Sequence, residues 1–169
     1  HSRRDLSSVL QALAGALEGL VPVDMVGVVT HERGGVRNRA IHLRSDPRRS
    51  DESQEAYVRR ISDATGGTED TFEHVPAVRD AMERDRRTMV FDDIGSDARL
   101  DPTAMKRLGA ECAVVVPLAM GEAFVAALVF GRTSPSPFPP DEVKVLEDVA
   151  GPVTTAVANA LAFEEIQKL

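Results

Sequence analysis

The chain has 169 residues, of which 43% are hydrophobic and 28% are charged, and its formal net charge is −7. This length suits one domain with one core, so residues 1–169 are expected to form a single unit. The acidic balance lacks the basic field that phosphate contacts need, which argues against direct nucleic-acid binding. A lone cysteine and the lack of a membrane-length apolar run predict a cytoplasmic protein without a membrane partner.

Both ends of the chain read as helices. Residues 1–20 are predicted to hold the first helix, because leucines and valines recur there at spacings of three and four. Residues 140–169 are predicted to form a long last helix, with Pro140 at its start and Pro152 expected to bend or break it. The chain begins with His1 and stops inside this helical pattern, so we interpret it as a segment of a longer protein.

Between these helices the pattern predicts a first hairpin and then mixed elements. Strands are expected at 25–31 and 36–44 around a Gly-Gly turn, with Arg37 and Arg39 on the solvent face of the second strand. A polar surface excursion, 46–67, should contain one short helix. A helix at 75–84, a brief strand in "TMVFDDI" and a helix at 102–108 follow.

The stretch "ECAVVVPLAMGEAFVAALVFGR" predicts a second hairpin. Its Gly121-Glu122 turn suits type II′, and a simple two-residue turn would pair Val116 with Ala127 and Val114 with Val129. Both faces of this hairpin are apolar. We therefore expect it in the middle of a sheet that is covered on both sides.

Three stretches carry a resemblance to the GAF domain family: "VDMVGVVTHERGG", "AVVVPLAMGEAFVAALVFGR" and "FPPDEVKVLEDVAGPVTTAVANALAFEEIQKL". The resemblance implies an α+β fold of the PAS and profilin-like kind, with five to six antiparallel strands. The terminal helices would cover one face of the sheet. A ligand pocket roofed by the middle helices and loops would lie on the other face.

The closing "ANALAFEEIQKL" resembles the helix that leaves the sensory GAF domain in sigma-54-dependent activators of the formate-hydrogenlyase type. That setting would make the chain the input module of a transcriptional regulator, with formate or another small acid as its ligand. Helices of this composition also end GAF domains in other signalling proteins, so that wider reading stays open.

The loop "VFDDIGSDARLDP" offers the first candidate ligand contacts, because loops after strands present functional groups on a rigid scaffold. Phe91, Asp92, Asp93 and Arg99 are candidates here, with a solvated turn as the alternative. Arg44, at the end of a strand, could bind a carboxylate or phosphate. His42 alternates with Ile41 and Leu43, so it points either into the pocket or into water.

Cys112 precedes an apolar run, which predicts a buried wall residue rather than a reactive thiol. It is kept among the candidates for contact with the ligand. GAF domains that attach a bilin often have histidine after their cysteine, whereas Ala113 stands here. GAF enzymes that reduce free methionine sulfoxide use several cysteines, and this chain has one.

A metal- or haem-based gas or redox sensor is the alternative on the same fold. His31, His42, His74, Cys112 and the two aspartates after Phe91 carry suitable donor atoms, and His42, Asp93 and Cys112 are the weak candidates. None of them has ligand spacing, so no metal site and no cofactor are evident.

The main hypothesis is a non-catalytic sensor in which a small molecule binds between the sheet and residues 92–108. The change would travel along the last helix of a homodimer formed through the terminal helices. Positions 146, 150, 153, 157, 160 and 164 have the spacing of a dimer seam. No phosphate loop or nucleophile motif is present, so no enzyme activity is expected. A structural dimeriser with a filled pocket remains a further possibility.

Overall fold

The computed structural model describes residues 5–32, 35–64, 71–72, 76–99 and 109–167. These residues form one six-stranded antiparallel sheet in the order β3-β2-β1-β6-β5-β4. The strands are β1 (Met25–Glu32), β2 (Gly35–Leu43), β3 (Thr71–Phe72), β4 (Met89–Phe91), β5 (Cys112–Met120) and β6 (Ala123–Arg132). The helices are α1 (Leu6–Leu17), α2 (Gln54–Ala64), α3 (Pro76–Glu83), the 3-10 turn η1 (Ile94–Ser96) and α5 (Pro140–Gln167).

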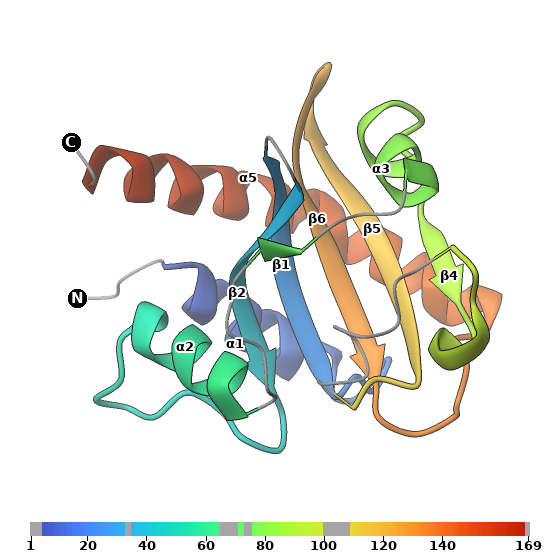
Figure 1. Ribbon diagram of the computed structural model, residues 1–169, viewed down its shortest axis with the longest axis horizontal. Helices are drawn as coiled ribbons and strands as arrows, with labels where there is room; N and C mark the ends of the chain where they lie inside the picture. The colour runs from blue at the N-terminus through green and yellow to red at the C-terminus, as the bar shows by residue number, and fades with distance from the viewer. Residues whose placement is uncertain (1–4, 33–34, 65–70, 73–75, 100–108, 168–169) are drawn as a thin grey trace.

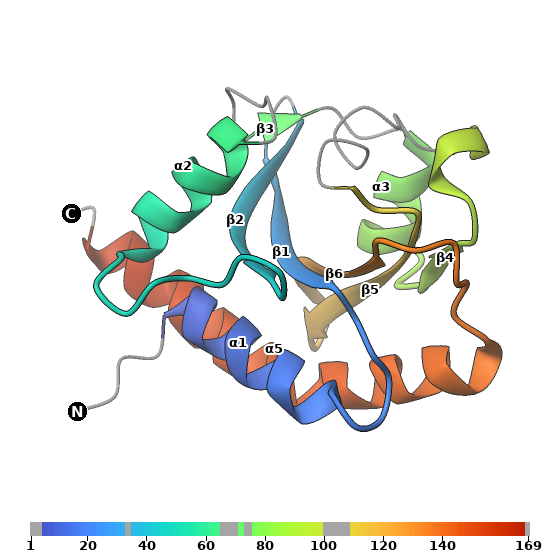
Figure 2. The ribbon, with the colours of Figure 1, turned by 90° about the horizontal axis from the view of Figure 1, so that it is seen from below.

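The sheet separates two layers of helices (Figures 1 and 2). Figure 2 shows α1 and α5 side by side along one face, with α2 and α3 toward opposite edges of the other face. We call these the terminal-helix face and, after the pocket that the sequence predicts there, the ligand face. The predicted α+β architecture is confirmed, and the helix expected at 102–108 lies outside the described residues.

The terminal-helix face holds the larger core. Every second residue of β5 and β6 points into it, so that Val114, Leu128 and Phe130 are fully or almost fully buried beneath α1 and α5. The apolar stripe predicted for the first helix packs here, with Leu6, Leu10, Leu13 and Leu17 buried. The opposite side chains of the same strands are also buried, as in a sheet covered on both sides.

The β5–β6 hairpin departs from the predicted register. Gly121 has φ +60° and Glu122 a negative φ, as a type II′ turn requires, and Met120 pairs with Ala123. A bulge between Leu118 and Ala119 then leaves Val125 as an extra residue. Beyond the bulge Val116 pairs with Leu128 rather than with Ala127, and Val114 with Phe130 rather than with Val129. The predicted pairing was wrong there because a bulge shifts all later partners by one residue.

The last helix runs without interruption from Pro140 to Gln167, about 42 Å at the usual rise per residue. Pro152 was expected to bend or break the helix, and it does not break it. Pro152 and Asp148, whose carbonyl would accept the hydrogen bond that proline cannot donate, are both exposed, so water can take the place of that bond. The positions predicted as a dimer seam face the protein's own sheet instead. Leu146, Ala150, Val157 and Ala160 are buried there, which is why they showed apolar spacing.

Candidate functional site

The ligand face of the sheet is floored by aliphatic and small side chains. Met25 and Val29 on β1, Ala113 and Val115 on β5 and Ala127 on β6 are buried on this side. Gly131 lies beside Met25, and a Cβ at Gly131 would fall 2.7 Å from Met25 Cγ, so the glycine lets Met25 lie across β6. The floor is apolar and offers no charged side chain of its own.

The two flanking helices cover the floor from opposite sides. On α3, Val78, Ala81 and Met82 are buried in the same cluster as the floor. On α2, Tyr57 and Ile61 pack on Ile41 and Leu43 of β2. Segment 92–108, expected as the roof, is described only as far as residue 99. The described site is therefore an apolar floor bordered by α2, α3 and the turn after β4.

One histidine adds a polar corner to this floor. His31, near the end of β1, has a side chain only 1% exposed, and its Nδ1 lies 3.3 Å from Oε1 of Glu83 on α3. Its ring lies 4.8 Å from the ring of Phe124 on β6. His31 shares the strand face of Val29, so alternation along β1 was the signal that could have assigned it to this side of the sheet.

Two arginines fix the position of α3 around this corner. Arg79 donates to the carbonyls of Glu32 and Gly35 and to the carboxylate of Glu83. Arg86, whose φ is +51°, donates to the carbonyls of Glu83 and Glu122. These bonds join α3 to the β1–β2 and β5–β6 hairpins. Sequence reasoning missed them because nothing in the local pattern indicates which carbonyls a long arginine will reach.

Because His31 is buried, it should make the stability of the fold sensitive to acid. Burial lowers the pKa of His31 and outweighs the opposing effect of Glu83, and burial also lowers the pKa of His42. The unfolded chain therefore binds more protons, so we expect stability to be full above pH ~6.5 and to fall as the pH drops below it. Urea unfolding between pH 8 and 5 measures this. His31→Gln should flatten the decline, and an unchanged pH profile in that variant would contradict the assignment.

The candidates after β4 lie at the border of the ligand face. Phe91 is fully buried in the ligand-face core, and the Arg99 guanidinium lies 4.7 Å above its ring. Arg99 also donates to the carbonyl of Val90 and to Asp97, which lowers the pKa of Asp97. Asp92 and Asp93 are exposed, and Asp93 accepts a hydrogen bond from Ser96. This segment presents exposed acidic groups and a fixed arginine beside a buried aromatic ring.

The remaining three candidates lie elsewhere. Residue alternation places His42 on the terminal-helix side with Ala40. Arg44 is 58% exposed at the end of β2 and forms an ion pair with Asp24. Cys112 lies on the side of Val114, where its Sγ donates to the carbonyls of Ser134 and Ser136. Burial raises the pKa of the Cys112 thiol, the opposite of what a reactive thiolate needs.

The weak metal candidates are not brought together. His42 and Cys112 belong to β2 and β5, which are separated by β1 and β6, a distance of about 14 Å at the usual strand spacing. Two ligands of one ion lie within a few ångströms of each other. Within the described part of the chain, no cluster of three or more His, Cys, Asp or Glu side chains is placed to hold a metal ion.

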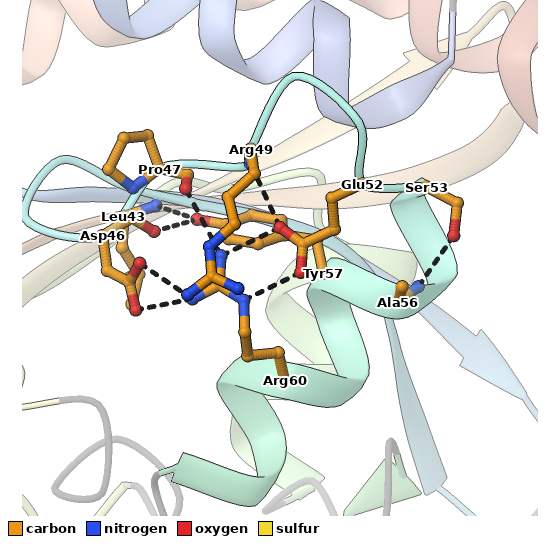
Figure 3. Close-up of polar contacts among 9 residues, drawn as sticks. All are labelled: Leu43, Asp46, Pro47, Arg49, Glu52, Ser53, Ala56, Tyr57 and Arg60. Atoms are coloured by element: carbon orange, nitrogen blue, oxygen red, sulfur yellow. Dashed lines mark hydrogen bonds and ion pairs between the residues drawn. The ribbon is translucent and has the colours of Figure 1, made fainter.

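A polar network anchors α2 at the other border (Figure 3). Arg60 donates two hydrogen bonds of 2.8 Å to the carboxylate of Asp46 and further bonds to Glu52, and this lowers the pKa of Glu52 to about 2. The Tyr57 hydroxyl donates to the carbonyl of Asp46 and accepts from the amide of Leu43. These contacts fasten α2 to the end of β2.

An antiparallel sheet with terminal helices on one face and a helix-bordered apolar floor on the other places the chain in a class of small α+β domains. The family model described as "GAF domain" matches residues 3–158, and the chain belongs to the GAF domain family. GAF domains are in general sensory, regulatory domains of signalling proteins. No helix among the described residues has the length and apolar character to cross a bilayer.

Solved structures with the same fold come from several kinds of protein. A GAF domain/HD domain protein from Geobacter sulfurreducens is 17% identical with a TM-score of 0.64, and 96% of this chain and 99% of that chain are covered. The GAF domain of a two-component sensor histidine kinase from Bacillus halodurans is 12% identical with a TM-score of 0.65 and the same coverage. A type II free methionine-R-sulfoxide reductase from Thermoplasma acidophilum is 14% identical with a TM-score of 0.59, covering 90% and 92%. A comparison with curated protein sequences gave no match.

Proposed function

We propose that this domain is a non-catalytic sensor that binds a small molecule on the ligand face. The observation that best supports this proposal is the apolar floor of the sheet, which is bordered by the buried His31 and by the pair of Arg99 and Phe91. An apolar body with one ionisable group, as in a small organic acid, fits such a surface. The similar histidine-kinase domain supports a signalling role. We propose the cytoplasm as its compartment and a sigma-54-dependent transcriptional regulator, which the closing segment of the sequence resembles, as its specific setting.

The buried thiol supports the non-catalytic part of this proposal. The similar sulfoxide reductase is an enzyme, but Cys112 is the chain's single cysteine and its Sγ donates to two carbonyls from within the terminal-helix layer. A thiol with a raised pKa is a poor nucleophile at neutral pH.

A thermal-shift screen of small carboxylic acids and nucleotides tests the binding function. A ligand at 100 times its Kd should stabilise the fold by about 2.7 kcal/mol, which is roughly 5–10 °C in Tm for a chain of this size. His31→Gln should abolish the shift and His42→Gln should retain it, because the two histidines lie on opposite faces. No shift with any acid or nucleotide, or a shift lost in His42→Gln alone, would contradict this placement.

The homodimer that we propose uses the outer side of α5, since its inner side packs on the sheet. Phe163 is 49% exposed and Ile166 is 64% exposed on the last turns of this helix. Phe163→Glu with Ile166→Glu should convert a dimer to a monomer in sedimentation velocity. Met120→Glu is the matched control, because Met120 is also 49% exposed but lies at the β5–β6 turn. A wild-type chain that sediments as a monomer at high concentration contradicts the dimer.

A further inference from the structure

The last two turns of α5 are attached to the domain chiefly by polar contacts. The deeply buried positions of this helix end at Ala160, and from Leu161 to Ile166 no residue is buried. Leu161 packs partly against the core, while Phe163 and Ile166 are exposed. Releasing this end of α5 therefore exposes little apolar surface, and its position depends on the hydrogen bonds that hold it.

Glu164 provides these hydrogen bonds. Its Oε1 accepts from Nη2 of Arg39 at 3.1 Å, and its Oε2 accepts from Nε2 of Gln54 at 3.2 Å. The Arg39 side chain is 9% exposed, not on the solvent face that simple alternation predicted. A bulge in β2 opposite Val28 and Val29 makes Arg39 the extra residue of its strand and turns it toward α5.

Gln54 links this carboxylate to a third helix. It is the first residue of α2 and is 7% exposed. Its Oε1 accepts from the backbone amide of Ser7 at 2.9 Å, one of the amides in the first turn of α1 that has no partner within the helix. The side-chain amide of Gln54 thus accepts a hydrogen bond from α1 through its oxygen and donates one to α5 through its nitrogen.

Helix α2 reaches both layers because it borders an edge of the sheet. Strand β3 pairs with β2 only at Val36 and Arg37, and Figure 2 shows α2 beside β2 with its start toward α1 and α5. Tyr57 and Ile61 of the same helix pack on the ligand-face side chains of β2. A displacement of α2 from the ligand face would therefore move Gln54 directly, around the edge of the sheet.

We propose that α2 is the element that couples the ligand face to the last two turns of α5, through the hydrogen bond between Gln54 and Glu164. In one state Gln54 and Arg39 hold residues 161–167 against the domain. In the other state α2 has shifted, Glu164 has lost one of its two donors, and the end of α5 is released. This inference rests on the proposed sensory function and names the contact through which that function would leave the domain.

Hydrogen exchange followed by mass spectrometry tests the coupling without a ligand. Arg60→Met removes the hydrogen bonds of Arg60 to Asp46 and Glu52 and loosens α2 without altering Gln54 or α5. We expect amide exchange in 161–167 to rise at least about threefold in this variant. Arg84→Met is the matched control, because Arg84 follows the end of α3 and pairs with Asp80 and Asp85 there, and it should leave exchange in 161–167 unchanged.

A second pair of variants tests the link itself. Gln54→Leu should raise exchange in 161–167 on its own, and adding Arg60→Met to it should have no further effect there. Glu164→Gln should act like Gln54→Leu. Glu165→Gln removes a carboxylate that is 64% exposed and lies 3.8 Å from Nη2 of Arg39, beyond hydrogen-bond distance, so it should act weakly. All samples are compared at one protein concentration, because the proposed dimer would also protect this helix from exchange.

If Arg60→Met made amide exchange faster in α2 but left exchange in 161–167 unchanged, the proposed coupling would be overturned. If Arg60→Met raised exchange in 161–167 by the same factor in the wild-type chain and in Gln54→Leu, the hydrogen bond between Gln54 and Glu164 would not carry the coupling. Neither result depends on finding a ligand. Failure of the coupling is therefore distinguishable from failure of the binding function, which the thermal-shift screen measures.

Discussion

Replacing Arg132 with leucine is expected to lower the free energy of unfolding by about 2–4 kcal/mol. The Arg132 side chain is 8% exposed, and its Nη2 donates at 2.8 Å to the carboxylate of Glu142. It also donates to the carbonyls of Pro22, Ser136 and Pro137. The ring of Phe138 lies 3.9 Å from the guanidinium carbon. Leucine would leave these acceptors without their donor.

The directions of the Arg132 hydrogen bonds also decide which other residue could restore the lost stability. Arg132 donates in several directions at once from the end of β6, and this joins the segment before β1 to the loop that leads into α5. Lysine carries the charge but has a single ammonium on a flexible stem, so Arg132→Lys should recover less than half of the loss. Urea unfolding followed by circular dichroism measures both variants.

Arg44→Leu is the control for charge removal. Arg44 is 58% exposed with one ion pair, so its loss should change stability by no more than about 1 kcal/mol. If Arg132→Leu were no more harmful than Arg44→Leu, water would be able to satisfy the carbonyls around Arg132. The β6–α5 junction would then not depend on this side chain.

The architecture was predictable because its elements have strong periodic signals. Two apolar faces in the β5–β6 hairpin indicated a sheet covered on both sides, and alternation now shows which residues serve which layer. Val114 and Val116 face the terminal helices, while Ala113 and Val115 face the ligand side. The sequence could not assign the layers, since both sets are small and aliphatic.

The bulges were not predictable, and they account for the errors in the β5–β6 pairing and in the facing of Arg39. A bulge is a property of two paired strands, so it leaves no periodic signal in either one. The bulge after Leu118 shifted the predicted pairs of Val114 and Val116 by one residue. The bulge at Arg39 placed that side chain against α5, where its partner Glu164 is 125 positions away in the sequence.

Prediction of the candidate site was limited for the same reason: the side of the sheet on which a residue lies depends on how the strands pair. The turn after β4 was chosen from its local chemistry. Phe91 belongs to the ligand-face core, and the Arg99 guanidinium lies over its ring. His42 and Cys112 were chosen for their donor atoms, but strand alternation places both on the terminal-helix side. Glu164 appeared only as an interruption of an apolar stripe. The structure shows it to be the polar end of the stripe that packs on the domain itself.

Replacing Pro152 with alanine is expected to raise the free energy of unfolding by about 2 kcal/mol. Pro152 lies in the interior of a continuous helix, where it cannot donate to the carbonyl of Asp148 and its ring crowds the preceding turn. Its side chain is exposed, so alanine gives up little packing. The substitution restores one helical hydrogen bond and removes the steric conflict.

Gly151→Ala is the matched control on the same turn. A Cβ at Gly151 would meet nothing within 4 Å, so alanine should stabilise the helix through backbone entropy alone, by about 0.5–1 kcal/mol. Guanidinium unfolding of both variants measures the difference. A gain for Gly151→Ala together with a loss for Pro152→Ala would contradict the helical argument. It would mean that the pyrrolidine ring itself makes a stabilising contact. Because Pro152 is exposed, that contact would have to be with a second copy of the chain on the exposed side of α5.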